Sequence, residues 1–168
     1  AASDVYKRQG SPSGTFRHHF SRRAVPQLKT TIEDCERPLG VVNALIALPF
    51  IGSDDAMEAL LAHVDSSQED RSYVRIRAAL GTEVMLDRGG LTEARIAGYL
   101  RELGTAAEHE THPWALRHML RALRVVAIEQ RPAQDSLTDA VERVVTNVEN
   151  ESGDDLAADV MTYRHAIG

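Results

Sequence analysis

The sequence predicts an all-helical protein, an α-solenoid built from about four antiparallel helical hairpins. Apolar residues recur at spacings of three, four and seven, which is the period of an amphipathic helix. Part of this pattern returns at an offset of 32 residues, as it does in helical-repeat proteins. Aromatic residues make up only 5% of the chain, and Ala and Leu fill most predicted core positions, which favours closely packed helices over a sheet.

The clearest hairpin is predicted at residues 53–80, which read SDDAMEALLAHVDSSQEDRSYVRIRAAL. Its first helix places five apolar residues on one face: Ala56, Met57, Leu60, Leu61 and Val64. Ser53 and the two aspartates after it suit the start of this helix, because they can bond its free N–H groups and complement its dipole. Residues 65–70 are polar and predict a turn. A second helix carries another apolar set: Tyr73, Val74, Ile76, Ala79 and Leu80.

The first hairpin repeats part of this pattern. Residues 24–34 align with residues 56–66, so that Ala24 matches Ala56, Leu28 matches Leu60 and Ile32 matches Val64. A helix of this length is marginal alone in water. Each hairpin is therefore expected to bury its apolar face against the next, in chain order.

The segment AMEALLAHVDSSQEDRSYVRIRAAL resembles the short bacterial and archaeal form of HEAT repeats. It reproduces the inter-helix Asp65, the pair Val74 and Arg75, and the final Ala-Ala-Leu. The resemblance is strong for this hairpin, fair for the first and only patterned for the two that follow. It departs from the family in its long turn, in Tyr73 and in a drifting period. It implies a right-handed, HEAT- or armadillo-like solenoid in which second helices line the concave side and Arg75 contacts Asp65.

Turn and cap signals place the remaining elements. The first hairpin has helices at 24–34 and 41–51, and Pro49 is expected to kink the second or end it early. In the second hairpin, Gly89 and Gly90 are expected to end the helix at Arg88. The third hairpin has helices at 91–103 and 114–130, with a turn at 104–113 between them. The fourth hairpin has helices at 137–148 and 156–167.

The first 23 residues are expected to be a disordered tail, ahead of a repeat domain at 24–168. Residues 4–9, DVYKRQ, resemble the translation of a transposase recognition end used in preparing sequencing libraries. Residues 1–9 are therefore interpreted as an adapter artefact on a metagenomic fragment whose native N-terminus is missing. Residues 10–23 are basic and rich in Ser and Gly, which indicates a linker.

Charge and composition exclude several classes of protein. The net charge is −6, and residues 1–23 have a balance of +4, which leaves −10 for residues 24–168. Such an acidic domain disfavours wholesale nucleic-acid binding. The sequence has no run of 18 apolar residues that would predict a membrane span, and no stretch with the charged start, apolar middle and small-residue cleavage site of a secretory signal. The single Cys35 excludes an internal disulfide and favours a cytoplasmic location.

Arginines on the predicted second helices are the candidate binding residues. Arg71 lies four residues before Arg75, and Arg117, Arg121 and Arg124 form a stripe with helical spacing. If this stripe lies exposed on the concave side, it would attract an anionic partner. Scattered arginines, or arginines paired with acids, would rule the idea out.

Catalytic and metal-binding patterns are lacking. His109, Glu110 and His112 have the wrong spacing for a zinc protease and fall in the predicted turn. Cys35 has no His in its own hairpin, and no Gly-rich phosphate loop occurs. We therefore expect no metal, no cofactor and no enzymatic activity. Trp114 is expected to be a core residue at a helix start.

The function favoured by the sequence is a non-enzymatic helical-repeat scaffold that binds a partner protein through its concave face. Other classes stay open because fold alone does not fix function. The chain could be a regulatory repeat appendage of an enzyme encoded upstream, a DNA-binding or base-repair HEAT-like protein, or, least favoured, a bilin-lyase subunit. The intact reading frame would separate the first of these from the scaffold.

Overall fold

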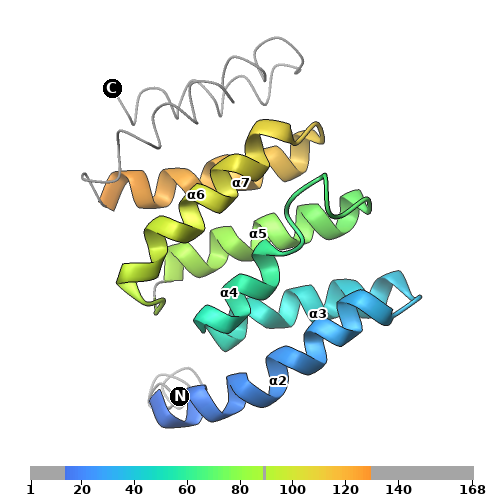
Figure 1. Ribbon diagram of the computed structural model, residues 1–168, viewed down its shortest axis with the longest axis vertical. Coiled ribbons are helices and arrows are strands. Elements are labelled where there is room, and N and C mark those ends of the chain that lie inside the picture. The colour runs from blue at the N-terminus through green and yellow to red at the C-terminus, as the bar shows by residue number, and fades with distance from the viewer. Residues whose placement is uncertain (1–13, 89, 130–168) are drawn as a thin grey trace, which may run out of the picture.

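Six α-helices make up the part of the chain that the computed structural model describes, residues 14–88 and 90–129 (Figure 1). They are α2 (Gly14–Asp34), α3 (Pro38–Ile51), α4 (Asp54–Leu61), α5 (Ser72–Arg88), α6 (Glu93–His109) and α7 (Pro113–Glu129). No strand occurs among these described residues, which confirms the all-helical prediction. The fourth hairpin, predicted within 131–168, lies outside them.

The helices form two layers. α2, α4 and α6 lie in one layer, and α3, α5 and α7 lie behind them (Figure 1). Within each layer the middle helix contacts both others, so α4 touches α2 and α6 while α5 touches α3 and α7. Figure 1 shows the three helices of a layer running in the same direction. The apolar core lies between the layers.

The predicted hairpin at 53–80 occupies the centre of this arrangement. Its helix α4 contacts α2, α3, α5 and α6 and ends at Leu61, before Val64, which was expected on the same helix face. Leu60 in α4 and Val64 in the turn after it are both fully buried. Ser53 caps α4 as predicted, because its Oγ accepts a hydrogen bond from the N–H of Ala56 at 3.2 Å. The turn predicted at 65–70 lies within a longer connection, 62–71, in which the Asp65 carboxylate accepts a bond from the N–H of Ser67 at 2.8 Å.

Glycines end two helices. α5 stops at Arg88, as predicted, and Gly90 has a φ of +95°. α3 ends at Gly52, whose φ of +63° is a left-handed cap conformation. The helix thus runs past Pro49, which was expected to kink it or end it early. Pro49 sits within the last turn, where its ring is buried, so the helix needs to continue for only two residues beyond it.

α2 begins ten residues before the predicted helix, at Gly14. Residues 14–23, which the sequence assigned to a disordered tail, are therefore helical. Ser21 is buried in this segment; its hydroxyl lies 2.7 Å from that of Ser53 and donates a bond to the Asp55 carboxylate at 3.2 Å. These contacts tie α2 to the start of α4. Residues 1–13 lie outside the described part of the chain.

α6 is longer than predicted. The turn expected at 104–113 shrinks to residues 110–112, because the helix continues to His109. Ala106 and Ala107 are almost fully buried, and their strong helix propensity agrees with their place in a helix interior. α7 begins at Pro113, which suits a first helical position.

Gly81 lies where α5 packs closely against Leu60 of α4 and Pro49 of α3. A Cβ added there would lie 2.8 Å from a methyl carbon of Leu60 and 3.3 Å from the ring of Pro49. We predict that Gly81→Ala lowers the free energy of unfolding by about 1–2 kcal/mol, because overpacking exceeds the gain in helix propensity. Gly98 is the matched control, since a Cβ there meets nothing within 4 Å. Gly98→Ala should stabilise by about 0.5–1 kcal/mol in the same urea titration; equal effects of the two substitutions would contradict the prediction.

Candidate binding surfaces

Arg75 joins the second hairpin to the third. Its Nε donates to the Glu110 carboxylate at 2.7 Å and its Nη2 donates to the other oxygen at 3.2 Å. Its Nη1 donates to the backbone carbonyls of Glu69 and Asp70. The hydrogen bonds to Glu110 raise the pKa of Arg75 above its ordinary value. Arg75 is therefore a structural residue.

The partner predicted for Arg75 was wrong. Asp65 was expected to accept this guanidinium, but its carboxylate bonds to the turn at Ser67, and Arg75 reaches Glu110 instead. The side chain of Glu110 is completely buried, although the sequence placed it in a solvated turn. Val74, the other residue of the repeat motif, is fully buried in the core.

Arg71, a predicted binding residue, is held by its own hairpin. Its Nε and Nη2 donate to the two carboxylate oxygens of Glu69, each at 2.8 Å, and its Nη1 donates to the carbonyl of Ile32 in α2 at 3.2 Å. His63 Nδ1 lies 3.2 Å from the same carboxylate. Burial opposes ionisation of Glu69, but the bonds from Arg71 and His63 outweigh it and lower its pKa from 4.5 to about 2. This geometry stabilises the turn and leaves Arg71 little capacity for a ligand.

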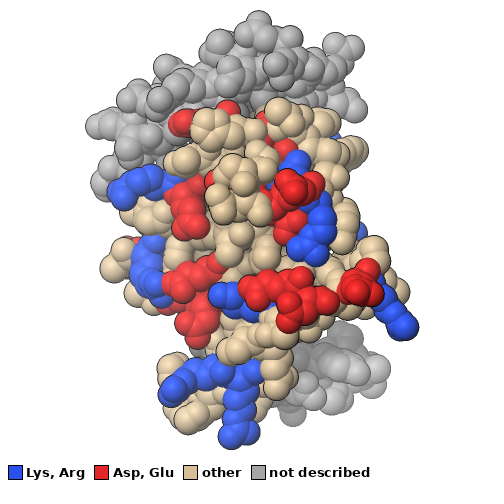
Figure 2. All heavy atoms as spheres, turned by 45° about the vertical axis from the view of Figure 1, so that its right-hand side comes forward, with Lys and Arg blue, Asp and Glu red and all other residues tan. Residues whose placement is uncertain are grey.

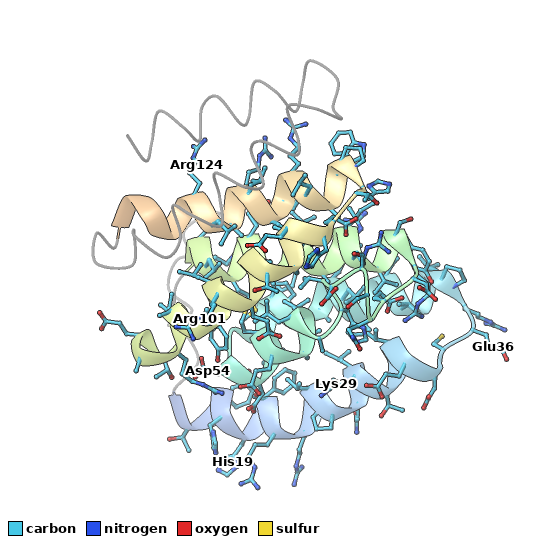
Figure 3. The ribbon with its side chains drawn as sticks, turned by 45° about the horizontal axis from the view of Figure 1, so that its top comes forward. His19, Lys29, Glu36, Asp54, Arg101 and Arg124 are labelled. Atoms are coloured by element: carbon cyan, nitrogen blue, oxygen red, sulfur yellow. The ribbon has the colours of Figure 1, made fainter. Side chains whose placement is uncertain are left out.

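The predicted arginine stripe on α7 is uneven. Arg117 and Arg121 are half-buried, and only Arg124 is exposed. The Arg117 guanidinium lies 5.4 Å from the ring centroid of Trp114, and Figure 3 shows Arg124 pointing away from α5. Whether the three bind a common anion stays a prediction. On the side drawn in Figure 2, acidic and basic side chains lie next to one another rather than in separate fields.

Trp114 is not the core residue that the sequence predicted. It stands at the start of α7, as expected, but 56% of it is exposed. Because Trp114 is the second residue of its helix, it lies at the edge of the packed region. Its contact with Arg117 is a cation–π interaction at the surface.

The exposed face of α3 is a feature that the sequence analysis did not single out. Leu39, Ile46 and Phe50 are 72%, 43% and 71% exposed, and their spacings of seven and four place them on one side of the helix. The buried residues Val41 and Leu48 occupy the opposite side. The sequence could have indicated this face, because residues 38–51 contain no charge. A helix without a charged side is normally covered on all sides, so an uncovered side of it suggests a missing partner.

An open pocket of about 380 Å³ lies between α4, the turn after it and α6. It exists because α4 has only eight residues while α6 has 17. Its lining includes the apolar Leu61, Val64 and Ala106 and the polar Arg101 and Glu102. Burial, and then the nearby charge of Glu58, raise the pKa of Glu102. The charged residues of the lining are two acids, Asp65 and Glu102, and one base, Arg101.

The first turn of α4 binds α6 through Asp54. Its carboxylate accepts bonds from the N–H and hydroxyl of Thr92 and from the hydroxyl of Tyr99 at 3.0 Å. Burial works against ionisation of Asp54, but the bonds from Thr92 and Tyr99 and the charge of Arg95 together lower its pKa. Burial, followed by Asp54 itself, raises the pKa of Tyr99. Thr92 and Tyr99 both donate to this carboxylate, so the cluster joins the second hairpin to the third.

Metal and membrane features are absent from the part of the chain that the structure describes. Within residues 14–88 and 90–129, no three His, Cys, Asp or Glu side chains are placed to hold a metal ion together. Over the same residues, none of the helices is both long and apolar enough to cross a bilayer. Cys35 is a half-buried thiol, and its Sγ lies 3.6 Å from the carbonyl oxygen of Arg37.

Comparison with known proteins found no matching family model, no similar curated protein and no similar solved structure. The resemblance to HEAT repeats therefore rests on the residues of the second hairpin.

Proposed function

We propose that this chain is a non-enzymatic scaffold of HEAT-like hairpins that binds a partner protein through the outer face of its second helices. The packing of each layer in chain order supports this proposal, since serial contacts are typical of a solenoid. The proposed superhelix is right-handed and contains about four hairpins. An experimental structure with a left-handed superhelix would contradict that part.

The observation that carries the proposal is the exposed apolar face of α3. Three large apolar side chains stand on one side of a helix that has no charged residue. Single exposed apolar residues are ordinary, but several on one side of a helix indicate an interaction surface. The exposed Asn43 lies between Leu39 and Ile46 on this side and adds one polar group to it. The three apolar side chains lie on α3, one of the second helices, which form the binding side in the family that the sequence resembles.

The proposed function is tested by selection from a displayed library of random peptides. The full chain is immobilised, and bound peptides are measured against the variant Ile46→Glu. We expect peptides that bind the natural chain and lose at least about tenfold in affinity to the variant, because a charge would have to be buried in the contact. Ala97→Glu on the exposed surface of α6 is the matched control and should bind normally. Failure to enrich any peptide that distinguishes the two variants would contradict the proposal.

A further inference from the structure

Two rows of side chains with the same spacing lie on the neighbouring helices α3 and α5. The row on α3 is Leu39, Ile46 and Phe50, and the row on α5 is Arg77, Val84 and Arg88; in each row the intervals are seven and four residues. Arg77 and Arg88 are exposed and Val84 is half-buried. Equal spacing places each set along one side of its helix over a length of about 16 Å.

The relative position of the two rows follows from one contact. The Arg88 guanidinium lies 5.0 Å from the centroid of the Phe50 ring, so the C-terminal ends of the rows are level. α3 and α5 are in contact and run in the same direction (Figure 1). Arg77 is therefore close to the level of Leu39, and the apolar row has a cation beside each of its ends.

These two arginines are available for a partner. No ion pair or hydrogen bond joins Arg77 or Arg88 to any other residue that the structure describes. α3 contains no acidic residue. On α5, the carboxylate of Glu83 is engaged by His118 Nδ1 of α7 at 2.6 Å, which leaves Asp87 as the exposed acid nearby.

We propose that the α3–α5 face, formed by these two rows, binds one amphipathic helix of a partner protein. The apolar side of that helix covers Leu39, Ile46 and Phe50, and acidic side chains about three turns apart meet Arg77 and Arg88. A helix in a shallow groove is anchored by residues at such spacings. The inference rests on the proposed function and adds to it the secondary structure and charge of the partner.

Electrostatics favour this occupant over two others. A two-fold contact between copies of this chain would place the same face against itself, and Arg77 and Arg88 would then approach like charges. An anionic bilayer is typically bound by clusters of about four to eight Lys or Arg, whereas the two rows contain two arginines, Arg77 and Arg88. An acidic helix gains both the apolar contact and the charge pairing.

The test uses the full chain and two synthetic helices of about 15 residues, each stapled to hold its conformation. Both carry the same apolar row, and they differ in having Glu or Lys at the two flanking positions. We expect the Glu helix to bind at least about tenfold more tightly in fluorescence anisotropy, with affinity that falls as salt is added. The double variant Arg77→Glu with Arg88→Glu should reverse the preference. Arg22→Glu with Arg23→Glu, on the exposed surface of α2, makes the same change of charge in the other layer and is the control that should leave the preference unchanged.

Other outcomes would overturn the inference. If neither helix is preferred while peptides sensitive to Ile46→Glu are still selected, the proposed function stands and the acidic-helix partner is wrong. Dimerisation of the chain that Ile46→Glu abolishes would assign the α3–α5 face to a second copy. Tighter binding to vesicles of phosphatidylcholine and phosphatidylserine than to either helix would assign it to a membrane. Circular dichroism of each variant checks that the fold is retained.

Discussion

Replacing Arg75 by Met is expected to lower the free energy of unfolding by about 3–5 kcal/mol, the cost of breaking a buried ion pair. The side chains of Arg75 and Glu110 are 9% and 0% exposed. Without the guanidinium, the Glu110 carboxylate would keep only the hydrogen bond from the N–H of His112 at 2.7 Å. The loss should appear as a fall in melting temperature of roughly 6–20 °C.

The double variant and a surface control make this prediction specific. Arg75→Met combined with Glu110→Leu should recover most of the lost stability, because neither charge is then buried without a partner. Arg95 is the control, since it pairs with Glu58 at the surface and about half of its side chain is exposed. Arg95→Met should change the melting temperature far less. A loss at Arg75 no larger than the loss at Arg95 would contradict the buried pair.

Much of the fold could be predicted because local signals and packing agree in the second hairpin. Ser53 caps α4, the polar turn follows, and α5 ends before the two glycines. Each of these features depends on side chains within a few residues of the backbone that they affect. Local chemistry of that kind can be read from the sequence alone.

The differences arise where distant contacts decide the outcome. Nothing near residue 20 in the sequence indicates that Ser21 bonds to Ser53, 32 residues later, so the start of α2 was missed. Residues 104–109 were predicted as a turn because polar residues stand at both ends of this segment. The burial of Ala106, which depends on packing with distant residues, could not be foreseen. Pro49 was weighed as a helix breaker, but its ring is buried next to Gly81 of α5, and such tertiary packing can outweigh local propensity.

The candidate sites divide in the same way. Val74 and Arg75 are both buried, but the choice between Asp65 and Glu110 as the partner of Arg75 depended on how the third hairpin lies over the second. Arg71 looked available in sequence and is paired in space. The α3–α5 face emerged only from exposure, because the apolar run at 41–51 is equally consistent with a helix covered on every side.

Acid is expected to lower the free energy of unfolding, because the Glu69 carboxylate stabilises the folded chain only while it is ionised. Folding lowers the pKa of Glu69 from 4.5 to about 2. A carboxyl whose pKa is lower in the folded state binds fewer protons there than in the unfolded chain between these two values. Its stabilisation is therefore fully present above about pH 4.5 and is lost as the pH falls towards 2. The difference between the two pKa values corresponds to at most about 3 kcal/mol.

Glu69→Gln should remove this pH dependence. At neutral pH the variant should be less stable by roughly 2–3 kcal/mol, because a neutral amide cannot replace the two charged hydrogen bonds from Arg71. Between pH 4.5 and 2 the curves for the variant and the natural chain should converge in urea unfolding at a series of pH values. Glu33→Gln, on the exposed surface of α2, should leave the slope unchanged. Parallel curves for Glu69→Gln and the natural chain would contradict this prediction, because they would mean that the Glu69 carboxylate does not stabilise the turn. In that case the hydrogen bond from Arg71 to the carbonyl of Ile32 would hold α2 against the second hairpin without help from Glu69.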